Sequence, residues 1–172
     1  MANRTTLFKG KPLNLVGSAV QVGDKAPDFA CVNNSLETVN LSKTGGKPRL
    51  FCAVPSLDTP VCSEETKKFD QAVGALKDKV ACYTISLDMP FAQKRFCTAE
   101  NVSNMQSLSD LHDGSFGKNY GVRIEGLPIP LLSRAVFVVD KNDKVTYVEY
   151  VSEVAQHPNY DNAVNALRAV AG

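Results

Sequence analysis

Three short apolar runs constrain the fold of this 172-residue chain more than any other feature of its sequence. They span residues 49–54, 80–87 and 135–140, and short apolar runs of this kind are typical of strands that are buried on both faces of a sheet. Residues 60–76, which separate the first two runs, have helical character. The order strand, helix, strand predicts a sheet that packs against at least one helix.

Weaker patterns fill the second half of the chain. Residues 90–100 predict a short helix, residues 106–109 predict a further strand, and residues 144–151 predict a strand that forms a hairpin with residues 135–140. The chain closes with an amphipathic helix, because its apolar residues recur at helical spacing. These residues are Tyr160, Ala163, Val164, Leu167, Val170 and Ala171.

The N-terminal part predicts small β elements. Residues 5–9 and 12–16 flank a turn and predict a β-hairpin, and strand-like pieces follow at 29–32 and 37–41. The complete order predicts an α/β protein with a thioredoxin-like fold, in which helices flank a mixed central sheet and the N-terminal hairpin is added. Flavodoxin-like sheets begin in a similar way, so the pattern leaves that alternative open.

Composition predicts a soluble globular protein. Hydrophobic residues make up 44% of the chain and charged residues 22%, and the formal net charge is +1. Such a charge exerts no long-range attraction on nucleic acids or anionic membranes. No segment reaches the roughly 18 apolar residues of a membrane span, and the first residues lack the apolar stretch of a secretory signal. We therefore expect a single domain over residues 1–172, located in the cytoplasm, that binds neither nucleic acid nor membranes.

The sequence contains five cysteines and no CxxC motif. An odd number of cysteines without regular spacing predicts mostly core thiols in a reducing compartment, with one or two reactive ones. Cys31, Cys52 and Cys82 lie in strand-like apolar stretches and are expected to be structural. The other two cysteines are the candidates for chemistry.

The segment from Pro55 to Cys62 follows the first buried strand and opens the long helix. Thr59 suits the N-cap and Pro60 suits the first helical position, which places Cys62 third in the helix. Backbone N–H groups lack partners there and the helix dipole favours an anion, so a thiolate would be stabilised. A buried cysteine that only packs is the alternative that these residues leave open.

The same segment resembles a known family. Pro-x-x-x-Thr-x-x-Cys is the active-site signature of peroxiredoxins, and Pro55, Thr59 and Cys62 fill it here. The fuller form, Pro-Ser-Leu-Asp-Thr-Pro-Val-Cys, is similar to that of the bacterial thiol peroxidases, which are atypical two-cysteine peroxiredoxins. The N-terminal hairpin and the segments 96–100 and 132–135 are also similar to that subfamily, so the resemblance spans essentially the whole chain.

The resemblance implies a role for each matching residue. Cys62 would attack the peroxide as a thiolate and become a sulfenic acid. Arg134 would hold the thiolate and polarise the peroxide, Thr59 would offer its hydroxyl to the sulfur and the peroxide, and Pro55 would shield the site. Cys97 would resolve the sulfenic acid by forming an intramolecular Cys62–Cys97 disulfide. Without the resemblance, Arg134 would be interpreted as part of a surface ion pair and Cys97 as a packing residue.

The resemblance further implies hydrogen peroxide and organic hydroperoxides as substrates, a thioredoxin-type protein reductant and a homodimer. We expect no cofactor, because flavin and nicotinamide fingerprints are missing, and no metal, because neither His112 nor His157 has ligands at suitable spacing. A thioredoxin-type disulfide oxidoreductase is one alternative function, which the lack of a CxxC motif disfavours. A redox sensor or holdase, whose disulfide alters a binding surface, is a second alternative.

Overall fold

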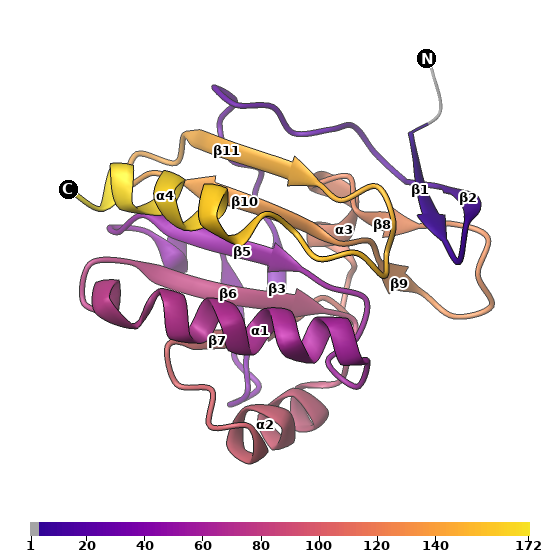
Figure 1. Cartoon of the computed structure of the whole chain (residues 1–172), viewed down its shortest axis with the longest axis horizontal. Helices are drawn as coiled ribbons and strands as arrows, with labels where there is room; N and C mark the ends of the chain where they lie inside the picture. Colours follow the sequence, from indigo (N-terminus) through magenta and orange to yellow (C-terminus); the bar gives the residue numbers. More distant parts are fainter. Residues whose placement is uncertain (1–3) are drawn as a thin grey trace.

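The three apolar runs form the centre of a mixed sheet in the computed structural model, which describes residues 4–172 (Figure 1). β5 (Arg49–Ala53) and β6 (Ala81–Ser86) are parallel neighbours. β10 (Ala135–Val139) pairs antiparallel with the other edge of β5. This antiparallel neighbour distinguishes the sheet from a flavodoxin-like one, whose strands run parallel, so the predicted mixed sheet is confirmed.

Four further strands complete the sheet. They are β3 (Ala30–Val32), β4 (Thr38–Asn40), β7 (Met105–Ser109) and β11 (Val145–Tyr150). The strand order is β11-β10-β5-β6-β7-β3-β4, in which β6 and β7 are parallel and the outer pairs are antiparallel. β10 and β11 form the hairpin that the sequence predicts.

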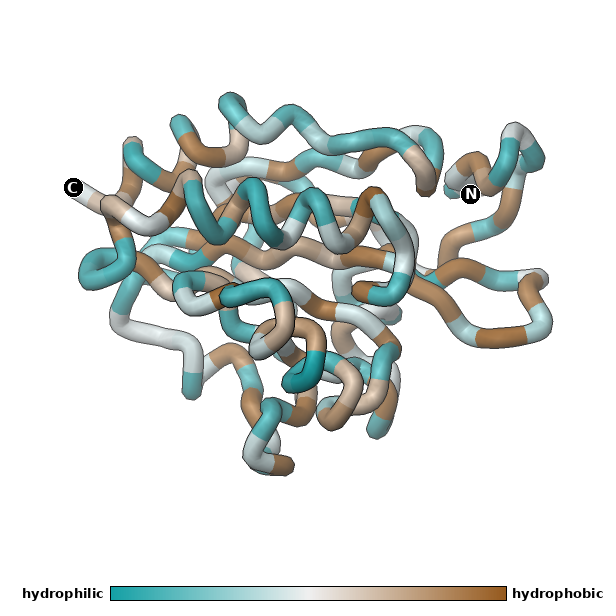
Figure 2. Tube along the Cα trace, turned by 60° about the horizontal axis from the view of Figure 1, so that its bottom comes forward, coloured by the Kyte–Doolittle hydropathy of each residue, from teal (hydrophilic) through white to brown (hydrophobic). Residues whose placement is uncertain are grey.

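Helices cover both faces of the sheet because neighbouring residues of the central strands point to opposite sides. Leu50 lies in an apolar cluster with α1 (Pro60–Ala72) and α4 (Tyr160–Ala171). Phe51, the next residue, lies in a second cluster with α3 (Ser115–Asn119). Figure 2 shows brown, hydrophobic segments running through the middle of the molecule, with much of the teal, hydrophilic colour toward its outside. The predicted layers of helix, sheet and helix are therefore present.

α2 (Pro90–Ala99) packs beside β7 and lies below the sheet in Figure 1. Gln93 is the buried residue of this helix. Its side-chain N–H group donates to the Ser86 hydroxyl at 3.1 Å and to the Leu108 carbonyl at 2.8 Å. Gln93 is thus the one fully buried anchor of the helix, and Phe96 and Cys97 are partly buried.

The predicted N-terminal hairpin is present as β1 (Thr5–Phe8) and β2 (Lys11–Asn14). Its two turn residues, Lys9 and Gly10, both have positive φ angles, 52° and 77°. Positive φ at both positions is the mark of a type I′ turn, whose twist matches that of the two strands. In Figure 1 the hairpin lies beyond the end of the sheet at which β5 leads into α1.

Several short elements between residues 110 and 134 were not predicted. They are α3, β8 (Arg123–Ile124) and β9 (Leu131–Leu132). A helix of five residues and strands of two are too short for a hydrophobic period to emerge from the sequence. Two further turns of 3₁₀ helix lie at Ser42–Thr44 and Gly74–Leu76. Within residues 4–172, no helix is both long enough and apolar enough to span a membrane.

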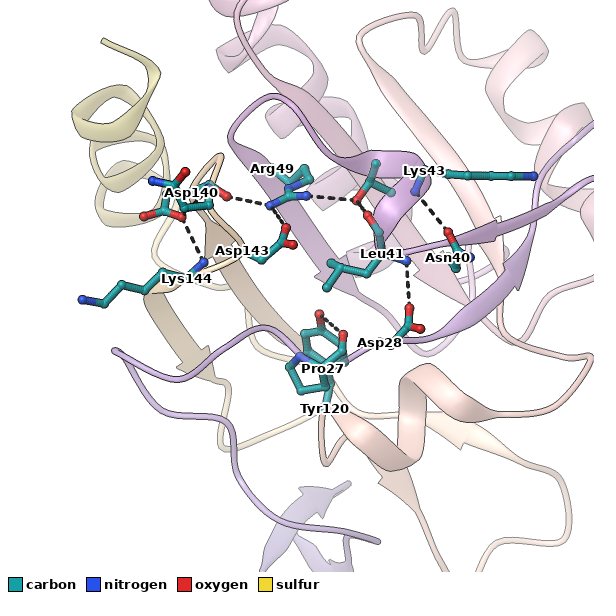
Figure 3. Close-up of polar contacts among 12 residues, drawn as sticks. Pro27, Asp28, Asn40, Leu41, Lys43, Arg49, Tyr120, Asp140, Asp143 and Lys144 are labelled. Carbon is teal, nitrogen blue, oxygen red and sulfur yellow. Dashed lines mark hydrogen bonds and ion pairs between the residues drawn. The ribbon is translucent and has the colours of Figure 1, made fainter.

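A buried arginine anchors the end of the sheet at which β5 begins (Figure 3). Arg49 is fully buried, and its Nη2 atom donates to the Asp140 carbonyl and to the Asp143 carboxylate, both at 2.6 Å. The Tyr120 hydroxyl donates to the Pro27 carbonyl in the same region at 2.8 Å. The two Arg49 contacts fix the turn between β10 and β11, while the candidate site lies at the opposite end of β5.

Candidate active site

Cys62 is the third residue of α1, as the sequence predicts, because the helix begins directly after its N-cap residue Thr59. The Cys62 side chain is fully buried and packs in a small cluster with Val54, Leu57 and Phe96. The sulfur therefore lies in the first helical turn, where backbone N–H groups have no helical acceptors. An apolar surrounding keeps water away and strengthens the attraction between these groups and a negative sulfur.

Arg134 connects the sulfur to two other parts of the chain. Its side chain is 1% exposed and comes from the residue just before β10. Its Nη2 atom donates to the Cys62 Sγ at 3.2 Å, its Nη1 atom to the Glu65 Oε2 at 2.5 Å, and its Nε atom to the Val154 carbonyl at 3.0 Å. A planar guanidinium with three such partners is held in one orientation. Arg134 is therefore buried against Cys62 and does not belong to a surface ion pair.

The charges around the sulfur favour a cationic Arg134. Desolvation alone would lower the pKa of Arg134, but Glu65 and Cys62 raise it above its ordinary value. Burial raises the pKa of Glu65 to about 7, although Arg134 acts in the opposite direction. In the described chain, residues 4–172, the Oε1 atom of Glu65 has no hydrogen-bond partner, which agrees with a carboxyl that ionises with difficulty.

Glu65 is a site residue that the sequence interpretation missed. It is fully buried on α1, three residues after Cys62 and four before Phe69, and thus on the same helix face. A charged residue on an otherwise buried stripe is an informative signal, because such residues are almost always paired. That signal was present in the sequence, but the arginine that pairs with it, 69 residues later, was not indicated.

The hydroxyl of Thr59 does not cap the helix. Thr59 has the extended backbone of an N-cap residue, but its Oγ1 atom donates to the Ser56 carbonyl at 2.7 Å. The Ser56 hydroxyl in turn donates to Asp88 at 2.7 Å, and the Leu57 backbone N–H donates to the same carboxylate at 2.8 Å. The loop before α1 is thus fixed by Asp88, a second residue that the sequence interpretation missed.

A cleft of about 300 Å³ opens beside Arg134. The loop before α1, the hairpin turn and the segment after β11 all contribute to its lining, most of which is apolar. The lining residues are Phe8, Lys9, Pro55, Ser56, Thr59, Pro60, Val61, Leu131, Arg134, Glu153, Val154 and Ala155. Three of the five predicted site residues, Pro55, Thr59 and Arg134, thus line this cleft, and the fourth, the buried Cys62, contacts Arg134.

The fifth predicted residue, Cys97, is not in contact with Cys62. Its neighbour Phe96 packs against Cys62, whereas Cys97 lines a separate groove with Ser107 and Val102. Consecutive residues of a helix point about 100° apart, so the two side chains of α2 face different surroundings. Burial raises the pKa of Cys97, partly offset by Ser107, and all five cysteines are free thiols.

The remaining cysteines have the surroundings expected of structural thiols. Cys31, Cys52 and Cys82 are buried in the two main apolar clusters. Burial raises the pKa of Cys82 to about 12 and raises the pKa values of Cys31 and Cys52 as well. Thiols of this kind form thiolates poorly and react slowly.

Comparison with protein families places most of the chain in one of them. Residues 21–164 match the family model described as Redoxin. A thiol peroxidase of Clostridium acetobutylicum is 53% identical over 140 residues, which cover 81% of this chain and 83% of that protein. A thiol peroxidase of Halalkalibacterium halodurans is 51% identical over 142 residues, which cover 83% and 84% of the two chains.

Solved structures show the same similarity. A peroxiredoxin-like protein from Aquifex aeolicus superimposes with a TM-score of 0.91 at 41% identity, covering 97% of each chain. A thiol peroxidase from Chromobacterium violaceum superimposes with a TM-score of 0.84 over 98% of each chain, and at 22% identity it supports the fold alone. The predicted thioredoxin-like α/β class is therefore confirmed.

Proposed function

This chain belongs to the Redoxin family and, within it, to the bacterial thiol peroxidases, and from this premise we propose that it reduces hydroperoxides with Cys62 as the attacking thiolate. The observation that carries the proposal is the 3.2 Å contact between Arg134 Nη2 and Cys62 Sγ at the start of α1. No other cysteine in the described chain, residues 4–172, accepts a hydrogen bond from a cation. Thiol-dependent peroxide reduction is the activity for which such a thiolate is suited.

In the first step, the Cys62 thiolate attacks one oxygen of the peroxide. A sulfur–oxygen bond forms, the oxygen–oxygen bond breaks, and the second oxygen takes up a proton and leaves as water or as an alcohol. Arg134 can donate to both the sulfur and the developing negative oxygen, because its guanidinium stays charged and points at the reacting atoms. The product on Cys62 is a sulfenic acid.

In the second step, we propose that the Cys97 thiol attacks the Cys62 sulfenic acid, releasing water and forming an intramolecular disulfide. Bridging requires Cα atoms within about 7 Å and side chains that face each other, so α2 must turn or unwind. The ten-residue length of α2 and its single buried side chain, Gln93, support such an opening, since short helices with little packing open at low cost.

We propose that a thioredoxin-type protein then supplies two electrons by thiol–disulfide exchange. We also propose that the protein acts in the cytoplasm, where a reducing environment keeps thiols available for this exchange. We also propose a homodimer, supported by apolar side chains that are available for contact, such as Phe91 and Ile129, each 61% exposed. Light scattering of the purified protein at micromolar concentration would measure its mass directly.

The test is peroxide consumption in the presence of a thioredoxin system, comparing wild type, Cys62→Ser and Cys97→Ser. We expect no turnover for Cys62→Ser. Cys97→Ser should consume about one peroxide per chain and then recycle poorly. Cys82→Ser is a matched control, because Cys82 is buried away from Arg134, and it should retain wild-type turnover. Full activity of Cys62→Ser would refute the proposal.

A further inference from the structure

A single carboxylate fastens the tip of the N-terminal hairpin. The Glu153 Oε1 atom accepts from the Lys9 backbone N–H at 3.3 Å, and its Oε2 atom accepts from the Gly10 N–H at 3.1 Å. In a type I′ turn these two N–H groups have no partners within the hairpin loop. A charged carboxylate that accepts both donors gives stronger hydrogen bonds than neutral acceptors would.

The same segment also pairs with the first strand of the hairpin. The Leu7 N–H donates to the Ser152 carbonyl at 2.8 Å, and the Val154 N–H donates to the Leu7 carbonyl at 2.9 Å. Residue 153 thus lies between two residues that are hydrogen-bonded to Leu7, and it forms a short parallel bridge with this strand. The carbonyl of Val154 accepts from Arg134 Nε at 3.0 Å, so the hairpin is joined through this segment to the centre of the site.

This attachment places the hairpin tip in the wall of the cleft beside Arg134. Phe8, Lys9 and Glu153 all line the cleft. Phe8 is half-buried there, while Lys9 is exposed. Without the Glu153 carboxylate, Leu7 would still pair with this segment, but the turn beyond Phe8 would lose both of its hydrogen bonds to residue 153. The part of the cleft wall that Phe8 and Lys9 form would then be less firmly held.

We propose that Glu153 is a positioning residue that determines specificity, because it holds Phe8 against the organic part of a bulky hydroperoxide. The inference rests on the proposed peroxidase function. An organic hydroperoxide carries an apolar group beyond the two reacting oxygens, and this group gains binding energy by contact with an apolar wall. Hydrogen peroxide has no such group, so it reacts at Cys62 and Arg134 without help from the hairpin.

The two substrates therefore separate a role in specificity from a role in general stability. Loosening the hairpin should raise KM for a bulky hydroperoxide with little change in kcat, because resolution and re-reduction do not involve the cleft wall. Loss of uniform binding of this kind appears in KM. General damage to the fold would instead lower the activity with both peroxides by the same factor.

The experiment compares cumene hydroperoxide with hydrogen peroxide for wild type, Glu153→Gln and Phe8→Ala. Glutamine keeps the size of Glu153 but offers one acceptor oxygen for two N–H donors. We expect each variant to lose about tenfold in kcat/KM with cumene hydroperoxide, and to lose less than about twofold with hydrogen peroxide. Glu125→Gln, an exposed glutamate beside the base of the hairpin, is the matched control and should behave as wild type.

Amide hydrogen exchange provides an independent measurement of the attachment. The amides of Lys9 and Gly10 should exchange faster in Glu153→Gln than in wild type, with the exchange of the central strands unchanged. Equal losses with both peroxides, or no loss with either, would overturn the inference while leaving the proposed function intact. A wild-type protein that reduces neither peroxide would instead refute the proposed function, and this inference with it.

Discussion

Replacement of Arg134 by lysine tests the site most sharply, because it keeps the positive charge and removes the planar guanidinium group. Three different nitrogens of Arg134 donate to Cys62, Glu65 and Val154. A lysine offers one compact ammonium group and cannot reach partners on three sides. We expect the lysine to stay with Glu65, whose carboxyl is buried and otherwise unpartnered in the described chain, and to leave the Cys62 sulfur without its donor.

The expected loss of rate and of stability in Arg134→Lys follows from the hydrogen bonds that the lysine cannot make. Removing one donor from the reacting centre of an enzyme costs about 10²–10³ in rate, so the reaction of Cys62 with hydrogen peroxide should slow by about this factor. Imperfect pairing of buried Glu65 should cost about 2 kcal/mol of stability, less than the roughly 3–5 kcal/mol for loss of a buried partner. For a chain of this length each kcal/mol lowers Tm by about 2–4 °C, which predicts a shift of about 4–8 °C.

Stopped-flow oxidation of the reduced protein measures the rate, and calorimetry measures Tm. Arg168→Lys, on the outer side of α4, is the matched control and should change neither quantity. An Arg134→Lys rate within about twofold of wild type would refute the reasoning, because it would show that the geometry of the guanidinium is unimportant for the reaction.

Three further predictions concern stability and resolution. The pKa of Glu65 in the folded chain, about 7, lies above its value in the unfolded chain. The free energy of unfolding should therefore fall by up to about 3 kcal/mol as pH rises from about 4.5 to 7. Urea titrations should show a weaker pH dependence in Glu65→Gln than in wild type, and an equal pH dependence in both would contradict the prediction. Gly17→Ala should destabilise the chain by about 2 kcal/mol or more, because Gly17 has a φ of +84° and a Cβ atom there would meet the Lys118 carbonyl. Gly23→Ala, at a φ of +98° in open space, should destabilise it by about 1 kcal/mol. Thermal unfolding of the two variants measures both effects. Gln93→Ala should loosen α2 and speed disulfide formation after oxidation, measured by the rate of thiol loss, and a slower rate would argue against opening of this helix.

The strands and helices of the core could be predicted because the apolar residues that each one buries recur at regular spacing in the sequence. Leu50 and Phe51 sit on opposite faces of a doubly covered strand, and such a strand is recognisable as a continuous apolar run. Thr59 and Pro60 mark the helix start by local chemistry alone. These features depend on neighbours in sequence, which is why the position of Cys62 in the helix was predicted correctly.

Contacts between distant residues could not be predicted in the same way. Glu65 and Arg134 meet across 69 positions, and nothing in the residues around Arg134 indicates a buried guanidinium. The hydroxyl of Thr59 donates to the Ser56 carbonyl and does not cap the helix, because Asp88 fixes the conformation of the loop before α1. The surroundings of Cys97, turned away from Cys62, likewise depend on how α2 packs on the sheet.

The proposed function requires that the Cys62 sulfur attacks the peroxide. The most direct measurement uses a chain in which Cys62 is the single remaining cysteine, treated with one equivalent of hydrogen peroxide and dimedone, with the adduct located by mass spectrometry. We expect the dimedone adduct of a sulfenic acid on Cys62, formed at the wild-type rate of oxidation. An unmodified Cys62, together with rapid peroxide consumption by a chain that lacks this cysteine, would show that another group attacks the peroxide.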